Sequence, residues 1–150
     1  MRKALTTLGA NRRESAVGGG RWLGAELDRT LIRAGVFDGG GYLLGKAKRS
    51  AKPERGMAAV LVRVACCLGD AVDECDLAWE AILGVGLGIA PGALPPGATE
   101  PDLRAMEAAL ASQVPVPVRV DLWARLAAWG IHVTELDRTP DLEAAVFRIF

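Results

Sequence analysis

The sequence is poor in aromatic residues, histidine and cysteine, and these shortages exclude several kinds of site. Aromatic residues make up 5% of the 150 residues while 51% are hydrophobic, so a core must consist mainly of Ala, Val and Leu. The single histidine, His132, and three cysteines without paired spacing predict neither a zinc site nor a disulfide framework. Cys66, Cys67 and Cys75 are instead typical of a reducing compartment, so we expect a cytoplasmic protein with no metal site.

The chain also has no excess of one charge and no long apolar run. Its 18 Lys and Arg residues balance 18 Asp and Glu residues, which argues against a protein that holds nucleic acid by bulk charge. The longest apolar run, residues 81–90, is too short and too rich in glycine to span a bilayer. Neither nucleic acid nor a membrane is therefore a predicted partner.

The length favours one domain preceded by a tail. Residues 1–20 show no period, contain several basic residues and end in three glycines, which predicts a flexible basic tail. Residues 21–150 are then expected to form a single domain, long enough to bury a substantial core.

Three strand-like runs follow the tail. They are Leu23–Leu27, Leu31–Phe37 and Tyr42–Lys48, separated by Asp28-Arg29-Thr30 and by Asp38-Gly39-Gly40-Gly41. Runs bounded in this way by turn-forming residues predict three consecutive antiparallel strands.

The pattern then alternates between helical and extended segments. Apolar residues between Met57 and Val72 share one helical face. Residues 81–92 suit a central strand buried on both faces, with glycines where neighbouring backbone comes close. Thr99 to Asp102 predicts a helix start, and residues 114–120 predict a strand that is clearest from Pro117 onward. Helical crossovers between strands imply an α/β domain with a mixed sheet.

Two further helices are predicted near the C-terminus. Asp121 is expected to cap a helix that runs to Trp129, and Gly130 to end it. The last segment begins with Thr139-Pro140 and is predicted to be a helix that covers one face of the sheet. Its apolar stripe consists of Leu142, Ala145, Val146, Ile149 and Phe150.

Three motifs resemble the N-terminal half of ROK proteins, the sugar kinases and sugar-responsive repressors of the actin-like ATPase superfamily. LGAELDRTLIRAGVFDGGG is similar to the first phosphate hairpin of that family, and ILGVGLGIAPG to its apolar glycine strand. PVRVDLWARLAAWG is similar to the stretch that carries the catalytic aspartate. The resemblance covers residues 22–130 and implies a single lobe with a ribonuclease H-like fold.

At the hairpin, the resemblance implies weakened phosphate binding. The family aspartate that helps to hold the magnesium of ATP corresponds to Glu26. Two glycines whose backbone amides approach the phosphates correspond to Asp28 and Arg29, whose side chains obstruct that approach. Thr30 is retained. Together these four residues are the predicted remnants of a nucleotide site.

The third motif departs further from the family. By the same alignment, the catalytic aspartate falls at Trp123 and a sugar-binding asparagine at Leu122, and neither side chain can accept the proton of an attacking hydroxyl. Asp121 is the remaining candidate for a catalytic carboxylate. The second phosphate loop and the adenosine-binding lobe of the family have no counterpart in this sequence.

These departures favour a catalytically inactive ROK-like domain that acts by binding or by self-assembly and uses no cofactor. The alternative is a glucokinase-like sugar/ATP phosphotransferase, completed by a partner chain or a second subunit, with Mg-ATP as its cofactor. We expect a homodimer, because exposed aromatic residues are typical interface anchors and two-fold pairing is the commonest assembly. An unidentified protein partner is the other expectation. The interface candidates are Trp123, Trp129, Phe147 and Phe150.

Overall fold

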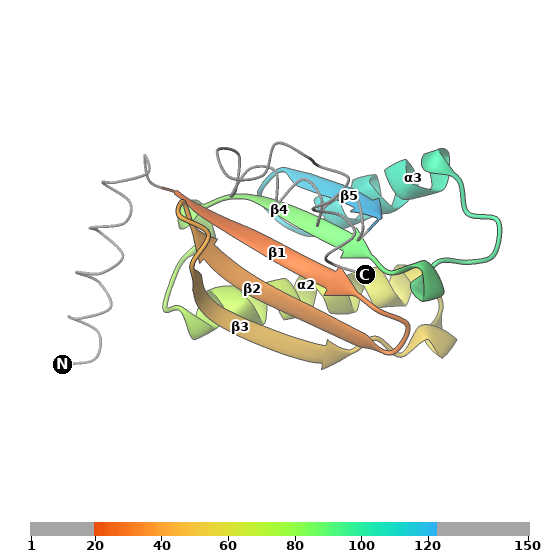
Figure 1. The fold of residues 1–150 in the computed structure, drawn as a ribbon, viewed down its shortest axis with the longest axis horizontal. Coiled ribbons are helices and arrows are strands. Elements are labelled where there is room, and N and C mark those ends of the chain that lie inside the picture. Colours follow the sequence, from red (N-terminus) through yellow and green to blue (C-terminus); the bar gives the residue numbers. More distant parts are fainter. Residues whose placement is uncertain (1–19, 123–150) are drawn as a thin grey trace, which may run out of the picture.

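The computed structural model describes residues 20–122, which form one five-stranded mixed sheet with helices packed against it (Figure 1). The strand order across the sheet is β3-β2-β1-β4-β5. The strands are β1 (Arg21–Leu27), β2 (Leu31–Asp38), β3 (Leu43–Ser50), β4 (Ile82–Ile89) and β5 (Val118–Leu122). The α-helices are α2 (Met57–Glu74) and α3 (Glu100–Ala111), and short 3-10 turns are η1 (Pro53–Arg55), η2 (Trp79–Ala81) and η3 (Pro91–Ala93).

The first three strands form the predicted antiparallel meander. The turn between β2 and β3 is fixed by Asp38, whose carboxylate accepts hydrogen bonds from the N–H groups of Gly40 and Tyr42, both at 3.0 Å. Gly41 has a φ of 81°, a conformation that glycine adopts without a steric penalty. The glycine-rich break in the sequence is therefore a tight, internally bonded turn.

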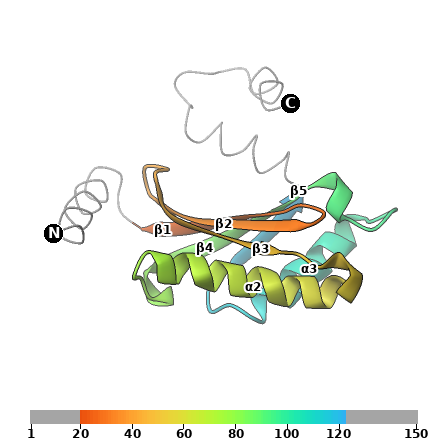
Figure 2. The same ribbon diagram turned by 90° about the horizontal axis from the view of Figure 1, so that it is seen from below.

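The last two strands are joined by helices, as the sequence predicted. β4 pairs in parallel with β1, and β5 pairs in parallel with β4. Helices α2 and α3 make the two crossovers and lie on the same side of the sheet (Figure 2). Alternate strand residues on this side pack against the helices and form the core. The largest fully buried strand side chains are Leu23, Leu27, Ile32, Val36, Leu87, Ile89 and Val120. The predicted α/β class with a mixed sheet is confirmed.

Strand β4 has glycine at three alternate positions, 84, 86 and 88, and one of them has an aromatic neighbour that the sequence did not predict. The sequence predicted glycines where neighbouring backbone comes close. At Gly84, an added Cβ would lie 3.4 Å from the backbone carbonyl oxygen of Pro117, and only 2.8 Å from the Trp22 ring, which is its nearest neighbour. The missing side chain thus makes room for an aromatic side chain of β1. Burial of β4 is nearly complete, except that Leu83 is 49% exposed.

Helix α3 begins at the predicted residues. Thr99 and Asp102 form a capping box, in which the Thr99 N–H donates to Asp102 Oδ2 at 2.6 Å. Within residues 20–122, no helix is long and apolar enough to cross a bilayer. Residues 1–19 of the predicted tail, the helix to Trp129 and the final helix lie outside the described residues.

Candidate functional site

The parallel strands of the sheet end at a common edge. β1 ends at Leu27, β4 at Ile89 and β5 at Leu122, and the loops that follow β3 and β4 leave from the same edge (Figure 1). In open α/β sheets, ligands bind beyond the carboxyl ends of the strands. This edge is therefore where a site is expected, and the β1–β2 turn lies on it.

The β1–β2 turn uses its own polar groups. The Asp28 N–H donates to the Leu31 carbonyl at 2.9 Å, and the Arg29 N–H donates to Asp28 Oδ1 at 2.7 Å. The Thr30 carbonyl accepts from the Ala51 N–H at 2.9 Å. None of these turn residues has a positive φ. The chain therefore forms this turn without the glycine pair of the family motif, and the amides of Asp28 and Arg29 are bonded internally.

Glu26 and Asp121 lie on the other side of the sheet, on the face opposite α2 and α3. Glu26 Oε2 is 3.5 Å from Arg33 Nη1, and Asp121 Oδ1 accepts from the Leu122 N–H at 2.8 Å. The register places Glu26, Gly88 and Asp121 in one row across β1, β4 and β5. Since Gly88 has no side chain, no side chain from β4 stands between the two carboxylates in that row.

The predicted role of Asp121 as a helix N-cap is wrong. Asp121 lies inside β5, opposite Gly88 of β4, and the strand continues to Leu122. An N-cap residue directly precedes the first helical residue, which a residue within a strand does not. An aspartate before an apolar run favours a cap by its local chemistry, but parallel pairing with β4 keeps the chain extended here.

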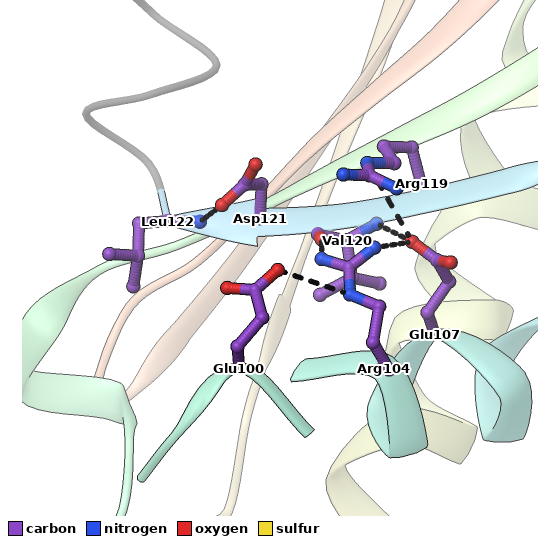
Figure 3. Close-up of polar contacts among 7 residues, drawn as sticks. All are labelled: Glu100, Arg104, Glu107, Arg119, Val120, Asp121 and Leu122. Atoms are coloured by element: carbon purple, nitrogen blue, oxygen red, sulfur yellow. Dashed lines mark hydrogen bonds and ion pairs between the residues drawn. The ribbon is translucent and has the colours of Figure 1, made fainter. Parts of the chain in front are cut away.

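The outer edge of β5 is bonded to side chains of α3 (Figure 3). The Val120 N–H donates to Glu107 Oε2 at 2.8 Å, and Arg104 Nη2 donates to the Val120 carbonyl. Arg104 Nη1 also donates to Glu107 Oε2, at 2.7 Å. Both backbone groups of Val120 that face away from β4 are thus satisfied, which holds the strand that carries Asp121.

Two weaker ion pairs extend this network. Arg104 Nε lies 3.5 Å from Glu100 Oε1, and Arg119 Nε lies 4.0 Å from Glu107 Oε2 (Figure 3). Sequence reasoning missed this arrangement. The spacing of Glu100, Arg104 and Glu107 is a recognisable signal for ion pairs along a helix. It does not reveal that their partner is the edge of a distant strand.

On the helix side of the same sheet edge, a groove lies between the β1–β2 turn, the start of α2 and the loop after β4. It consists of two adjoining hollows, of about 240 and about 420 Å³, that share Met57, Leu94 and Pro95. Asp28 and Arg29 border the first hollow, and Asp102 borders the second. The predicted remnant residues therefore do not form one cluster, because Glu26 belongs to the opposite face.

Local hydrogen bonds favour the ionised form of Asp102 at the groove. Bonds from the Thr99 amide, and then from its hydroxyl, hold the pKa of Asp102 below the usual aspartate value. Within residues 20–122, no three His, Cys, Asp or Glu side chains gather so as to hold a metal ion. The interface candidates Trp123, Trp129, Phe147 and Phe150 lie outside the described residues.

Comparison with known proteins identifies the fold. The sequence matches no protein-family model and none of the curated proteins. Among solved structures, a ROK hexokinase from Thermus thermophilus superposes with a TM-score of 0.60 at 26% sequence identity, over 75% of this chain and 38% of its own. The described residues have the fold of a ROK sugar kinase lobe. The predicted ROK resemblance, with its actin-like ATPase fold class, is confirmed.

Two other sugar kinases support the same assignment of fold. A ROK family glucokinase from Streptomyces griseus, solved with glucose and AMPPNP, gives a TM-score of 0.59 at 23% identity, over 80% of this chain and 38% of its own. An inorganic polyphosphate/ATP-glucomannokinase from Arthrobacter gives a TM-score of 0.59 at 19% identity, over 77% of this chain and 49% of its own. The ROK-like chain described here thus spans less than half the length of these kinases.

Proposed function

We propose that this chain is a catalytically inactive ROK-like domain that acts by binding or by self-assembly. The observation that carries the proposal is the internal bonding of the β1–β2 turn. The Arg29 amide donates to the Asp28 carboxylate at 2.7 Å, so an anionic group of the chain already occupies the place where a phosphate oxygen would accept. A second anion is repelled from that place.

The position of Glu26 supports the same conclusion. Its carboxylate is paired with Arg33 at 3.5 Å across the sheet, and it lies on the face opposite the Asp28–Arg29 border of the groove. A nucleotide held by both groups would have to reach around the end of the sheet. The positions corresponding to the catalytic aspartate and the sugar-binding asparagine, Trp123 and Leu122, carry no group that accepts a proton.

The test is a coupled assay of the full chain with magnesium, ATP and a panel of hexoses and amino sugars. We expect no turnover above the rate without protein. Turnover that disappears in Glu26→Ala and persists in the control Lys46→Gln, whose side chain lies on the same face two strands away, would refute the proposal.

One observation favours a second function, a phosphotransferase completed by another subunit. Glu26 and Asp121 lie in one row at the carboxyl ends of β1 and β5, with only Gly88 between them. Two carboxylates at that edge suit magnesium binding and proton acceptance once another chain supplies the phosphate contacts. Specific activity that rises with protein concentration and is lost in Asp121→Asn would establish this function. Its absence at every concentration would exclude assembly from two copies of this chain.

Self-association belongs to the main proposal and rests on the sequence. Trp123 and Trp129 occupy the stretch where the family motif has small or polar residues, and such aromatic residues are enriched at interfaces. We expect a homodimer, measured by light scattering, that Trp123→Asp converts to a monomer. A wild-type monomer at high micromolar concentration would contradict this. A cytoplasmic location is also proposed, on the strength of the three free cysteines at positions 66, 67 and 75.

A further inference from the structure

The outer edge of β3 is unpaired within residues 20–122. β3 is the last strand on its side of the sheet, and no described strand lies beyond it (Figure 1). An edge strand presents a row of free backbone N–H and C=O groups, with which another extended chain can pair. This edge is therefore a place where a partner can add a strand to the sheet.

Two hydrogen bonds at the end of β3 determine which of its residues point outward. The Ala51 N–H donates toward β2, to a carbonyl of the β1–β2 turn at 2.9 Å, whereas the Ser50 carbonyl accepts from Arg63 Nε of α2 at 2.6 Å. In an antiparallel pair, successive residues point their backbone groups alternately toward and away from the partner strand. The N–H and C=O groups of Lys46 and Lys48 therefore point outward. Among the described residues, no hydrogen bond from a helix or a loop reaches them.

The side chains of the same two lysines lie on the face of the sheet opposite α2. A Cβ added at Gly45 would lie 2.5 Å from the sulfur of Cys75, the C-cap residue of α2. Because side chains alternate along a strand, Lys46 and Lys48 then point to the other face, about 7 Å apart. Both are exposed, and no ion pair within residues 20–122 involves either of them. Two unpaired cations thus lie beside the outward backbone groups.

The charge of this edge defines the kind of strand that fits it. Residues 46–55 contain five Lys and Arg residues and one Glu, although the whole chain has 18 residues of each sign. Lysines on an edge strand oppose pairing with the same edge of a second copy, because like charges would then lie opposite each other. A strand with acidic side chains meets attraction in place of this repulsion. The edge therefore selects against a second copy and in favour of an acidic strand.

We propose that the outer edge of β3 binds an acidic, extended protein segment, which adds a strand to the sheet. Its backbone exchanges hydrogen bonds with Lys46 and Lys48, and carboxylates at alternate positions reach the two ammonium groups. The pairing ends before Ser50, whose carbonyl already accepts from Arg63. A nucleic acid satisfies the lysines but offers no matching row of backbone groups, so the free edge favours a peptide.

This inference names the partner for the binding role proposed above and rests on that role. Catalytic inactivity is tested separately, by the turnover assay. A failure of peptide binding therefore leaves the result of that assay unaffected, and turnover would not by itself exclude a partner at β3.

The first test is fluorescence anisotropy of a labelled hexapeptide of alternating glutamate and valine, titrated with the full chain. Lys48→Pro removes one outward N–H and leaves the bonds to β2 in place, so we expect an affinity loss of about tenfold or more. Lys46→Glu/Lys48→Glu should abolish binding. The matched control Lys52→Glu/Arg55→Glu makes the same change of charge beyond the end of β3, and it should bind within about threefold of wild type because salt screens distant charges.

Several results of this titration would overturn the proposal. One is the absence of saturable binding at millimolar peptide, and another is an equal loss of binding in the control variant. Equal binding of the N-methylated peptide, which keeps the carboxylates and loses the backbone donors, would show that no strand is added. Equal binding of single-stranded oligothymidylate would show that the edge attracts any polyanion.

The second test follows amide hydrogen exchange of the wild-type chain, and so does not depend on a variant that folds. Without peptide, the amides of Lys46 and Lys48 should exchange fast, whereas the Ala47 amide, which points toward β2, should exchange slowly. Saturating peptide should protect both lysine amides and leave Ala47 unchanged. Binding that protects neither lysine amide would overturn the proposal, because the peptide would then lie elsewhere.

Discussion

Removing the carboxylate of Glu107 should destabilise the domain more than removal of an ordinary surface charge. In Glu107→Ala, the Val120 N–H at 2.8 Å and the Arg104 guanidinium at 2.7 Å lose a common acceptor. Its side chain is 22% exposed, so water replaces the lost bonds only in part. Deleting one partner of hydrogen bonds to a charged group typically costs about 1–3 kcal/mol, and the partial exposure places this case in the lower half of that range.

The predicted loss of about 1–2 kcal/mol corresponds to a Tm lowered by roughly 4–9 °C for a domain of about 100–130 residues. Thermal unfolding followed by circular dichroism measures it. Glu107→Gln keeps an acceptor for Val120 and should recover part of the loss, while the exposed Glu54→Ala on η1 serves as the control. A Tm for Glu107→Ala within a degree of the Glu54 control would show that the β5 edge does not depend on this network.

Three other changes have defined outcomes. Leu87→Ala removes a fully buried side chain from the middle of the sheet and should cost about 2–5 kcal/mol in a denaturant titration; a cost below 1 kcal/mol would mean that the core is loosely packed. Because bonds from Thr99 lower the pKa of Asp102 below its usual value, wild type should have a larger free energy of unfolding than Asp102→Asn at neutral pH. This difference in free energy should shrink as the pH falls through the lowered pKa. A difference that does not change with pH would refute this. Burial raises the pKa of the Cys67 thiol, so Cys66→Ser should remove more of the fast reaction with a thiol reagent than Cys67→Ser does, and equal losses would contradict the burial.

The elements of the sheet were predictable because their signals are local. Alternating runs around Asp28-Arg29-Thr30 and Asp38–Gly41 predict an antiparallel meander, and β1, β2 and β3 follow it. The capping box at Thr99 marks the start of α3 within one residue. The order of helices and strands then requires parallel crossovers, which β4 and β5 make.

What escaped prediction depends on contacts between distant segments. Asp121 has the local chemistry of an N-cap, but its strand is held by β4 on one side and by Arg104 and Glu107 on the other. Gly84 makes room for Trp22, a residue of another strand. The groove needs the β1–β2 turn, the start of α2 and the loop after β4 together. No single stretch of sequence contains these relations.

The sequence predicted which residues belong to the candidate site, but it did not predict how they lie relative to one another. The resemblance to ROK proteins selected Glu26, Asp28, Arg29 and Thr30 from one hairpin. Because side chains alternate along a strand, Glu26 lies on the face of the sheet opposite α2 and α3. The turn that follows it borders the groove on the helix side. The bond from the Arg29 amide to the Asp28 carboxylate is a detail of turn geometry that sequence alone does not give.

The proposed loss of nucleotide binding can be measured by calorimetric titration of the full chain with magnesium and AMPPNP, a non-hydrolysable ATP analogue. We expect no saturable heat of binding, because the Asp28 carboxylate occupies the turn amide that a phosphate would need. A parallel titration of Asp28→Gly/Arg29→Gly, which restores the glycine pair, shows whether the turn alone is responsible. Saturable binding to the wild-type chain that is lost in Glu26→Ala would show that the hairpin still binds nucleotide.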